Sequence, residues 1–281
     1  VRFDAPVLSK SAVHTLNQRL EEILRGRYSR EGAPDKVPRR LRNEYEGSAH
    51  VNIDHPSSPE NNGTNKSDKK KKVQKKPVVG PLGFSPAHND RKRVLQIINA
   101  NKCDHLFRKL ACSPALGRVV AQLAGWQHEG VRLAQDQIWA KPPGAPPLAF
   151  HRDAPYFMFE PPYVVTVWLA LDEMDEELGP LEYVKGSHLW GGNERTGSLG
   201  HFFQRDGGMN ELRTAFDKRV SGDDFEIVSM AGLKQGALSI HDGRTWHGSS
   251  RNKSEFRPRR GFGIHFVPAN VRFTEDAKFS R

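Results

Sequence analysis

The stretch Phe150-His151-Arg152-Asp153-Ala154-Pro155-Tyr156-Phe157 decides how the rest of the chain is interpreted. Side chains alternate between the two faces of an extended strand, so His151 and Asp153 are predicted to lie side by side while Arg152 points away. An imidazole and a carboxylate are two thirds of the two-histidine-one-carboxylate face that holds non-haem Fe(II). A third ligand is needed, because an H-x-D pattern alone also fits a structural histidine.

The residues on either side predict a mainly β domain. From residue 131 onward, short segments rich in branched and aromatic residues are separated by Gly and Pro. We expect strands at 131–140, 148–153, 164–171, 181–184, 226–230, 236–241 and 261–267. With no helices of crossover length between them, the predicted fold is a double-stranded β-helix, a cupin-like jelly roll with flanking helices. The polar, Gly-rich segment 191–222 is expected to be a loop that acts as a lid over the barrel mouth.

Helices are predicted before these strands. Residues 8–26 carry one apolar stripe, formed by Val13, Leu16, Leu20, Ile23 and Leu24. Segments 90–99 and 103–111 are expected to be helical. Ser113-Pro114 is typical of a helix start. That helix is expected to end at Gly125 and to turn inward Leu116, Val119, Val120 and Leu123.

The net charge is +10, and part of the positive charge lies in the run Lys69-Lys70-Lys71-Lys72-Val73-Gln74-Lys75-Lys76. The run lies in a Lys/Ser/Asn-rich segment that is poor in apolar residues, so we predict a disordered insertion at 55–80. It would separate an N-terminal helical segment, 1–54, from a catalytic domain, 81–281. A nuclear-import or nucleic-acid-binding tract is the alternative, and a solvated loop is favoured because no aromatic residues interleave the lysines.

Cysteine use indicates a reducing, intracellular compartment, because only Cys103 and Cys112 are present and neither has metal-ligand spacing. The cytoplasm, peroxisome, mitochondrion and nucleus are not distinguished. No apolar run approaches the roughly 18 residues that span a bilayer. The chain begins at Val1 and is treated as a fragment, in which an upstream targeting signal would be invisible. The sequence indicates no oligomeric state.

Two candidates for the third iron ligand lie at 239–250. His241 ends a predicted strand, and His247 follows the turn signal Asp242-Gly243; spacing alone does not choose between them. Further on, Arg257-Pro258-Arg259-Arg260 opens the last predicted strand. A guanidinium there could bind a carboxylate of an iron cosubstrate.

In these motifs and several others, the chain resembles the phytanoyl-CoA dioxygenase family of Fe(II)- and 2-oxoglutarate-dependent oxygenases. The similar features span roughly residues 131–268 and occur in the family's order: Asp136-Gln137, Lys141-Pro142-Pro143-Gly144, His151-x-Asp153, Val167-Trp168-Leu169-Ala170-Leu171-Asp172, Gly179-Pro180-Leu181, Gly186-Ser187-His188, and His247-Gly248-Ser249 with Asn252 and Arg259. Each motif alone is weak, and their joint occurrence is specific.

The resemblance implies a site and a reaction. It makes His247 the iron ligand beside His151 and Asp153, and Arg259 the partner of the distal carboxylate of 2-oxoglutarate, with Arg257 as runner-up. It places three further residues around the cosubstrate: Trp168, Ser249 and Lys141. The implied cofactors are Fe(II), 2-oxoglutarate and O2, with ascorbate as reductant. The implied reaction hydroxylates a C–H of a small organic or lipid-like substrate and releases succinate and CO2, because halogenating relatives lack the carboxylate that Asp153 provides.

Several of these residues also have a structural interpretation. Trp168 fits a core position, His188 a loop-ordering role, and His241 a pocket wall. His265 on the last strand is expected to be structural. Alternation allows only one of Arg259 and Arg260 to face the barrel, and Arg259 is favoured.

Three alternatives to the oxygenase hypothesis remain. One is a catalytically inactive jelly roll that binds a small molecule. Another is a nucleic-acid-associated protein directed by the lysine run. The third is a zinc or manganese cupin acting as an isomerase or hydrolase. Basic residues concentrated at 244–260 could attract an anionic or CoA-linked substrate, although a solvated surface is slightly favoured.

Overall fold

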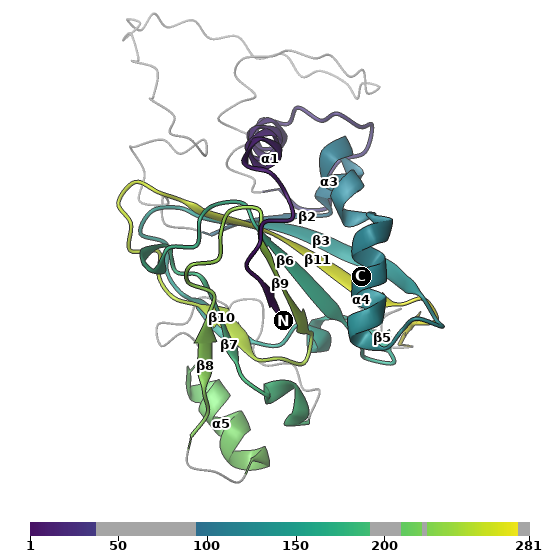
Figure 1. Cartoon of the computed structure of the whole chain (residues 1–281), viewed down its shortest axis with the longest axis vertical. Helices are drawn as coiled ribbons and strands as arrows, with labels where there is room; N and C mark the ends of the chain where they lie inside the picture. The colour runs from purple at the N-terminus through teal and green to yellow at the C-terminus, as the bar shows by residue number, and fades with distance from the viewer. Residues whose placement is uncertain (38–93, 192–208, 221–223, 275–281) are drawn as a thin grey trace, which may run out of the picture.

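The computed structural model describes residues 1–37, 94–191, 209–220 and 224–274 (Figure 1). The predicted insertion at 55–80 and its lysine run lie outside these residues. The division into 1–54, 55–80 and 81–281 therefore stays a prediction.

Two antiparallel sheets form the barrel and confirm the predicted double-stranded β-helix (Figure 1). The larger sheet has the order β1 (Arg2–Phe3), β9 (Leu238–Asp242), β6 (Val165–Ala170), β11 (Arg259–Pro268), β3 (Val131–Lys141), β2 (Leu95–Ile98). The smaller has the order β4 (Leu148–His151), β10 (His247–Ser249), β7 (Leu181–Val184), β8 (Ile227–Ser229). A separate pair joins β5 (Phe159–Glu160) to β12 (Arg272–Phe273).

Three of the predicted helices form, and each begins after a side-chain cap. The helix α1 (Lys10–Leu24) begins after Ser9, whose hydroxyl accepts from the Ala12 amide at 3.2 Å. Asp104 caps α3 (His105–Ala111), and Ser113 caps α4 (Pro114–Ala124). The described residues also contain four short 3-10 turns: η2 (Ala100–Lys102), η3 (Ala154–Tyr156), η4 (Glu176–Leu178) and η5 (Ser187–Leu189). Within the part of the chain that the structure describes, no helix is long and apolar enough to cross a bilayer.

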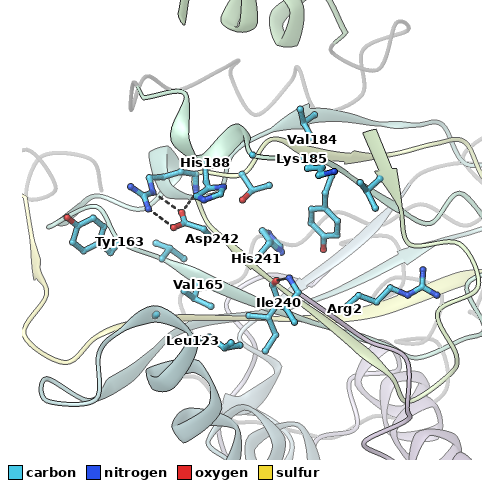
Figure 2. A pocket seen from close by; sticks show the side chains of 18 of the residues that line it. Arg2, Leu123, Tyr163, Val165, Val184, Lys185, His188, Ile240, His241 and Asp242 are labelled. Atoms are coloured by element: carbon cyan, nitrogen blue, oxygen red, sulfur yellow. Dashed lines mark hydrogen bonds and ion pairs between the residues drawn. The ribbon is translucent and has the colours of Figure 1, made fainter. Parts of the chain in front are cut away.

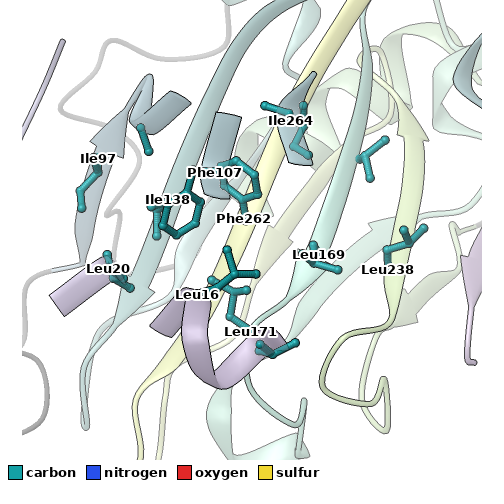
Figure 3. Packing of buried hydrophobic residues seen from close by; sticks show 14 of the residues in the cluster. Leu16, Leu20, Ile97, Phe107, Ile138, Leu169, Leu171, Leu238, Phe262 and Ile264 are labelled. Carbon is teal, nitrogen blue, oxygen red and sulfur yellow. The ribbon is translucent and has the colours of Figure 1, made fainter. Parts of the chain in front are cut away.

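The helices cover the outer face of the larger sheet and form the main core there (Figure 3). All five residues of the predicted α1 stripe are buried. From α3, Phe107 meets Phe262 of β11 edge to face, with ring centres 5.0 Å apart. On β6, β9 and β11 this covered face takes most of the apolar residues, and the alternate positions, among them Thr166, His241 and His265, point into the barrel.

One predicted helix is wrong. Residues 94–99 of the predicted helix 90–99 contain β2, which pairs with β3 along Leu95–Ile98. Two adjacent β-branched residues, Ile97 and Ile98, favour a strand. Ile97 packs in the outer core while Gln96 takes the opposite face, the alternation of an edge strand.

The predicted lid loop 191–222 is also wrong in its described part, because Met209–Arg219 forms the helix α5. Its buried residues Leu212, Ala215 and Phe216 follow helical spacing. With Phe150, Val184 and Trp246, α5 forms a separate apolar cluster against the smaller sheet. Its low overall hydrophobicity concealed this stripe in the sequence. Residues 192–208 and 221–223 lie outside the described residues.

The inward face of α4 was predicted too broadly. Val120 is fully buried and Leu116 is half-buried, but Val119 and Leu123 are exposed. The helix approaches β3 closely at Gly117, where an added Cβ would lie 3.2 Å from Val131. Because of this close approach, α4 packs on the sheet through only a narrow strip of its surface.

Candidate active site

Two histidines face each other across the pairing of β4 with β10. His151 ends β4 and lies opposite His247, which starts β10, with ring centres 4.3 Å apart. The Nδ1 atom of each ring lies close to a backbone carbonyl, 2.8 Å from Ala149 for His151 and 3.0 Å from Thr245 for His247. A carbonyl only accepts, so Nδ1 carries the proton in both rings and each Nε2 presents its lone pair.

Asp153 completes the cluster from just beyond the end of β4. The predicted strand 148–153 stops at His151, and Asp153 has helical dihedral angles (φ −74°, ψ −45°) at the start of η3. This turn, rather than strand alternation, brings Oδ1 of Asp153 to 3.8 Å from His151 Nε2 and 3.6 Å from His247 Nε2. The three potential ligand atoms all lie within 4.8 Å of one another, a spacing that one metal ion can bridge.

The protonation states of this cluster suit a divalent cation. Burial, reinforced by the neighbouring His247, lowers the pKa of His151 to about 4, and burial likewise lowers the pKa of His247 to about 4. Burial alone would raise the pKa of Asp153, but His247 and a hydrogen bond from His241 hold that pKa well below its usual range. Near neutral pH the cluster is therefore two neutral imidazoles and one carboxylate, as metal ligation requires.

The outer oxygen of Asp153 is held by residues of the larger sheet. Thr166 on β6 donates its hydroxyl hydrogen to Oδ2 at 2.6 Å, and His241 on β9 donates from Nε2 at 3.2 Å. The Thr166 oxygen in turn lies 2.9 Å from Nδ1 of His265 on β11. His241 and His265, expected to be a pocket wall and a structural residue, thus fix the carboxylate through its second oxygen.

A buried pair of cations lies further along the same inner face. Lys141 on β3 and Arg259 on β11 are direct cross-strand partners, only 1% and 2% exposed. Lys141 Nζ and Arg259 Nη2 each donate to the Ser249 hydroxyl at 3.1 Å, and Nζ also donates to the Ser250 carbonyl. The Arg259 guanidinium lies 5.5 Å from the centre of the Trp168 ring.

This cation pair has no acidic partner among the described residues. Burial, together with Arg259, lowers the pKa of Lys141 to about 6, and burial lowers the pKa of Arg259 to about 10. The Arg259 Nε atom is buried and makes no hydrogen bond within the described part of the chain. A buried basic pair of this kind is chemically suited to an anion.

The three arginines near the start of β11 have different surroundings. Arg259 points into the barrel, whereas Arg257 is exposed and forms ion pairs with Asp175 and Glu177. Arg260 points to the opposite face, where Asp172 holds it with a bidentate ion pair at 2.6 and 2.9 Å. Alternation along β11 accounts for the difference between Arg259 and Arg260.

A larger cavity of about 770 Å³ adjoins the site, because His241 lines both cavities. Figure 2 shows the larger cavity with His241 among its lining residues. Apolar side chains such as Leu123, Val165 and Ile240 line part of it. On its polar side, Arg244 is paired with Asp242 at 2.6 Å. His188 lines this cavity and takes no part in the Asp153 cluster.

Sequence reasoning missed Thr166 and the contact of His241 with Asp153. Thr166 stands two residues before Trp168, so alternation on the predicted strand 164–171 would have placed both side chains inside the barrel. No local pattern could have shown the contact of His241 with Asp153, because the two residues are far apart in the chain.

A double-stranded β-helix that presents two histidines and a carboxylate on its inner face defines the architecture of the non-haem iron oxygenases. The phytanoyl-CoA dioxygenase (PhyH) family model matches residues 3–261. The chain belongs to the phytanoyl-CoA dioxygenase family, as its motifs predicted.

Individual relatives are distant. A probable alpha-ketoglutarate-dependent hypophosphite dioxygenase of Stutzerimonas stutzeri is 27% identical over 146 residues, which are 50% of this chain and 47% of that protein. A phytanoyl-CoA dioxygenase domain-containing protein 1 homolog of Caenorhabditis elegans is 25% identical over 176 residues, 61% of this chain and 58% of that protein. The chain thus spans about half the length of the curated relatives it matches.

Among solved structures, the apoform of EctD from S. alaskensis has the same fold. It superposes with a TM-score of 0.57 at 16% identity and covers 98% of this chain and 75% of that one. At this identity the likeness supports the fold alone.

Proposed function

We propose that the chain is an Fe(II)- and 2-oxoglutarate-dependent dioxygenase that hydroxylates a C–H bond of a small organic or lipid-like substrate. One observation carries the proposal. Two groups of residues line the same cavity of the barrel: a cluster of two neutral histidines and one carboxylate, and a buried basic pair that has no acidic partner among the described residues.

The residues fit Fe(II). His151 and His247 present unprotonated Nε2 atoms, and Asp153 presents Oδ1 while its Oδ2 is occupied by Thr166 and His241. Three ligands gathered on one side would leave the remaining positions of an octahedral ion for a cosubstrate and O2. Thr166 and His241 would keep Asp153 monodentate and correctly turned.

The cation pair fits the distal carboxylate of 2-oxoglutarate. Arg259 offers a planar set of donors, Lys141 a second charge, and the Ser249 hydroxyl a neutral donor. Trp168, 4% exposed, packs against the guanidinium and excludes water from this end. The low dielectric would strengthen each contact to the anion.

When bound, Fe(II) and 2-oxoglutarate supply the activation of O2, one oxygen atom entering the succinate that leaves with CO2 and the other entering the substrate hydroxyl. The part of the protein is to hold the ligands, orient the cosubstrate through Arg259 and Lys141, and keep water out. Because Asp153 would give the metal a carboxylate beside the two histidines, we expect hydroxylation rather than halogenation.

The charges around the barrel support an uncharged small molecule better than an anionic or CoA-linked substrate. Of the basic residues at 244–260, Arg244, Arg257 and Arg260 are already paired with carboxylates. These pairs neutralise much of the concentration of positive charge that the sequence suggested.

The test is succinate formation from 2-oxoglutarate by the purified protein with Fe(II), ascorbate and O2, without any added substrate. Asp153→Ala and Arg259→Ala are expected to abolish it. Arg257→Ala is the matched control, because it removes an exposed guanidinium two residues away and should retain full activity. Absence of succinate and of iron binding in the wild type would instead support the inactive jelly-roll alternative.

A further inference from the structure

The inner face of β11 contains a space beside the Asp153 cluster. The inward positions of this strand are Arg259, Gly261, Gly263 and His265. At Gly261 an added Cβ would overlap the Trp168 indole. At Gly263, in contrast, it would meet only ordinary contacts, 3.7 Å from the Gln137 carbonyl and 3.9 Å from His265 Nε2. The space next to Gly263 lies in the same cavity as the ligand cluster.

His265 directs an unpaired acceptor towards this space. The single hydrogen of the Thr166 hydroxyl is donated to Asp153, so the Thr166 oxygen accepts from Nδ1–H of His265. The other nitrogen, Nε2, is then unprotonated. It is buried in a side chain 5% exposed and has no hydrogen-bond partner within the described residues. An unpaired buried acceptor is destabilising unless a ligand supplies a donor.

Carboxamides line the strand next to it. In the β3–β11 register Gln137 lies opposite Gly263, and Gln135 lies opposite His265. Gln96 on β2 donates to Gln137 at 2.8 Å, and Gln137 donates to Gln135. These half-buried amides form a continuous polar row, in which each bond polarises the next.

An aromatic residue packs against the His265 ring. The Phe157 ring lies 5.1 Å from the His265 ring and stacks nearly parallel on Phe159, at 5.6 Å and 6°. The cavity itself is lined by Gln137 of β3, and the His265 ring is flanked by the aromatic residue Phe157. A ligand placed here would sit beside the Asp153 cluster without competing for the cation pair at Arg259.

We propose that His265 Nε2 and the Gln135–Gln137 amides form a subsite for a hydroxyl or N–H group of the substrate. This inference rests on the proposed function and names the class of substrate: a small compound whose donor group binds His265 while an adjacent apolar part packs on Phe157. A compound lacking the donor would leave Nε2 buried and unpaired, which is how hydrogen-bonding sites reject apolar analogues. His265 would be a specificity-determining residue and not a metal ligand.

The test uses the ¹⁵N signal of His265 Nε2 in protein loaded with 2-oxoglutarate and Zn(II), a diamagnetic substitute for iron. The probes are matched pairs: cyclohexanol with methoxycyclohexane, 1-butanol with 1-methoxybutane, and N-methylacetamide with N,N-dimethylacetamide. We expect at least one donor compound to shift the Nε2 signal and to bind roughly tenfold or more tightly than its methylated partner.

Two substitutions distinguish recognition of the substrate by His265 Nε2 from the hydrogen bond that His265 Nδ1 donates to Thr166. His265→Asn keeps a donor at the Nδ1 position but removes the distal acceptor, so it should lose the difference in affinity between the donor compound and its methylated partner. His265→Gln keeps an acceptor near the Nε2 position and should restore part of that preference. The same donor preference in both variants, whether retained or lost, would assign His265 a purely structural role and overturn the proposal.

Other outcomes distinguish this inference from the proposed activity. A wild type that forms succinate, but whose Nε2 signal is unmoved by every probe or moved equally by both members of each pair, overturns the subsite alone. A wild type that forms no succinate but shows the donor preference overturns the oxygenase proposal and supports the subsite as a binding site.

Discussion

Lys141 and Arg259 lie directly opposite each other on β3 and β11, and both donate to the hydroxyl of Ser249. Two basic groups are thus buried together and share one neutral acceptor, while Lys141 also donates to the Ser250 carbonyl. Charging both would place two like charges side by side. Such an arrangement is unfavourable until an anion arrives, so the site is expected to couple anion binding to protonation.

The affinity for 2-oxoglutarate should fall with rising pH. The pKa of Lys141 is lowered to about 6, so above that pH the empty site holds a neutral amine, and binding the carboxylate takes up a proton. The Kd should increase by up to about tenfold per pH unit above pH 6, until the pKa of the bound state is reached. Calorimetry in buffers of different ionisation enthalpy measures the uptake. Lys141→Met should bind more weakly, with no proton uptake; uptake that persists in this variant would assign the proton to another group.

Removing the hydroxyl of Thr166 should weaken metal binding more than folding. Thr166→Val leaves Oδ2 of Asp153 with His241 alone, so the carboxylate is free to turn and the affinity for Fe(II) should fall about 10–100-fold. Thr166→Ser restores the hydroxyl and should bind as the wild type does. Titration with Fe(II) under anaerobic conditions gives the affinities. If Val and Ser variants bind iron equally, the hydrogen bond does not position Asp153.

Two glycines on β11 should respond differently to alanine. In Gly261→Ala the methyl group overlaps the Trp168 indole, so the free energy of unfolding should drop by about 1–3 kcal/mol and 2-oxoglutarate binding should weaken. Gly263→Ala has room for its methyl group and should unfold at nearly the wild-type temperature. Thermal unfolding of the two variants side by side checks this, and equal destabilisation would contradict the position of Trp168.

The N-terminal helix should be required for the stability of the barrel. Leu20 on α1 is 1% exposed within the core of the larger sheet, so Leu20→Ala should cost about 2–5 kcal/mol. His14→Ala on the exposed face of α1 should cost little. Urea denaturation of both variants gives the difference. A small effect of Leu20→Ala would mean that α1 is only loosely attached.

The parts of the fold that could be predicted are those set by local patterns. The stripe from Val13 to Leu24 identified α1, and the strand at Leu181–Val184 matches its predicted bounds. The strand β10 was missed because it has three residues, one of them Gly248, too few for a periodicity. The strand β2 was mistaken for a helix because its pairing with β3 is a tertiary contact.

In the candidate site, too, local spacing could be predicted and tertiary contacts could not. The pairing of His151 with Asp153 was predicted from their spacing, although a turn and not a strand produces it. The family resemblance, not the spacing, selected His247 and Arg259. The contacts of Thr166 and His241 with Asp153 depend on how β6 and β9 lie beside the end of β4, which neither alternation nor motif spacing encodes.

The pairing of β4 with β10 has a consequence for how the protein matures. His151 and His247 come from segments far apart in the chain, and they meet only when the smaller sheet closes. Non-local pairings of this kind form slowly, because a long loop must close before any contact is gained. The metal-binding cluster therefore cannot assemble in a partly folded chain. Acquisition of iron should be a late event in folding, and the rate of iron uptake by refolding protein should report closure of the barrel.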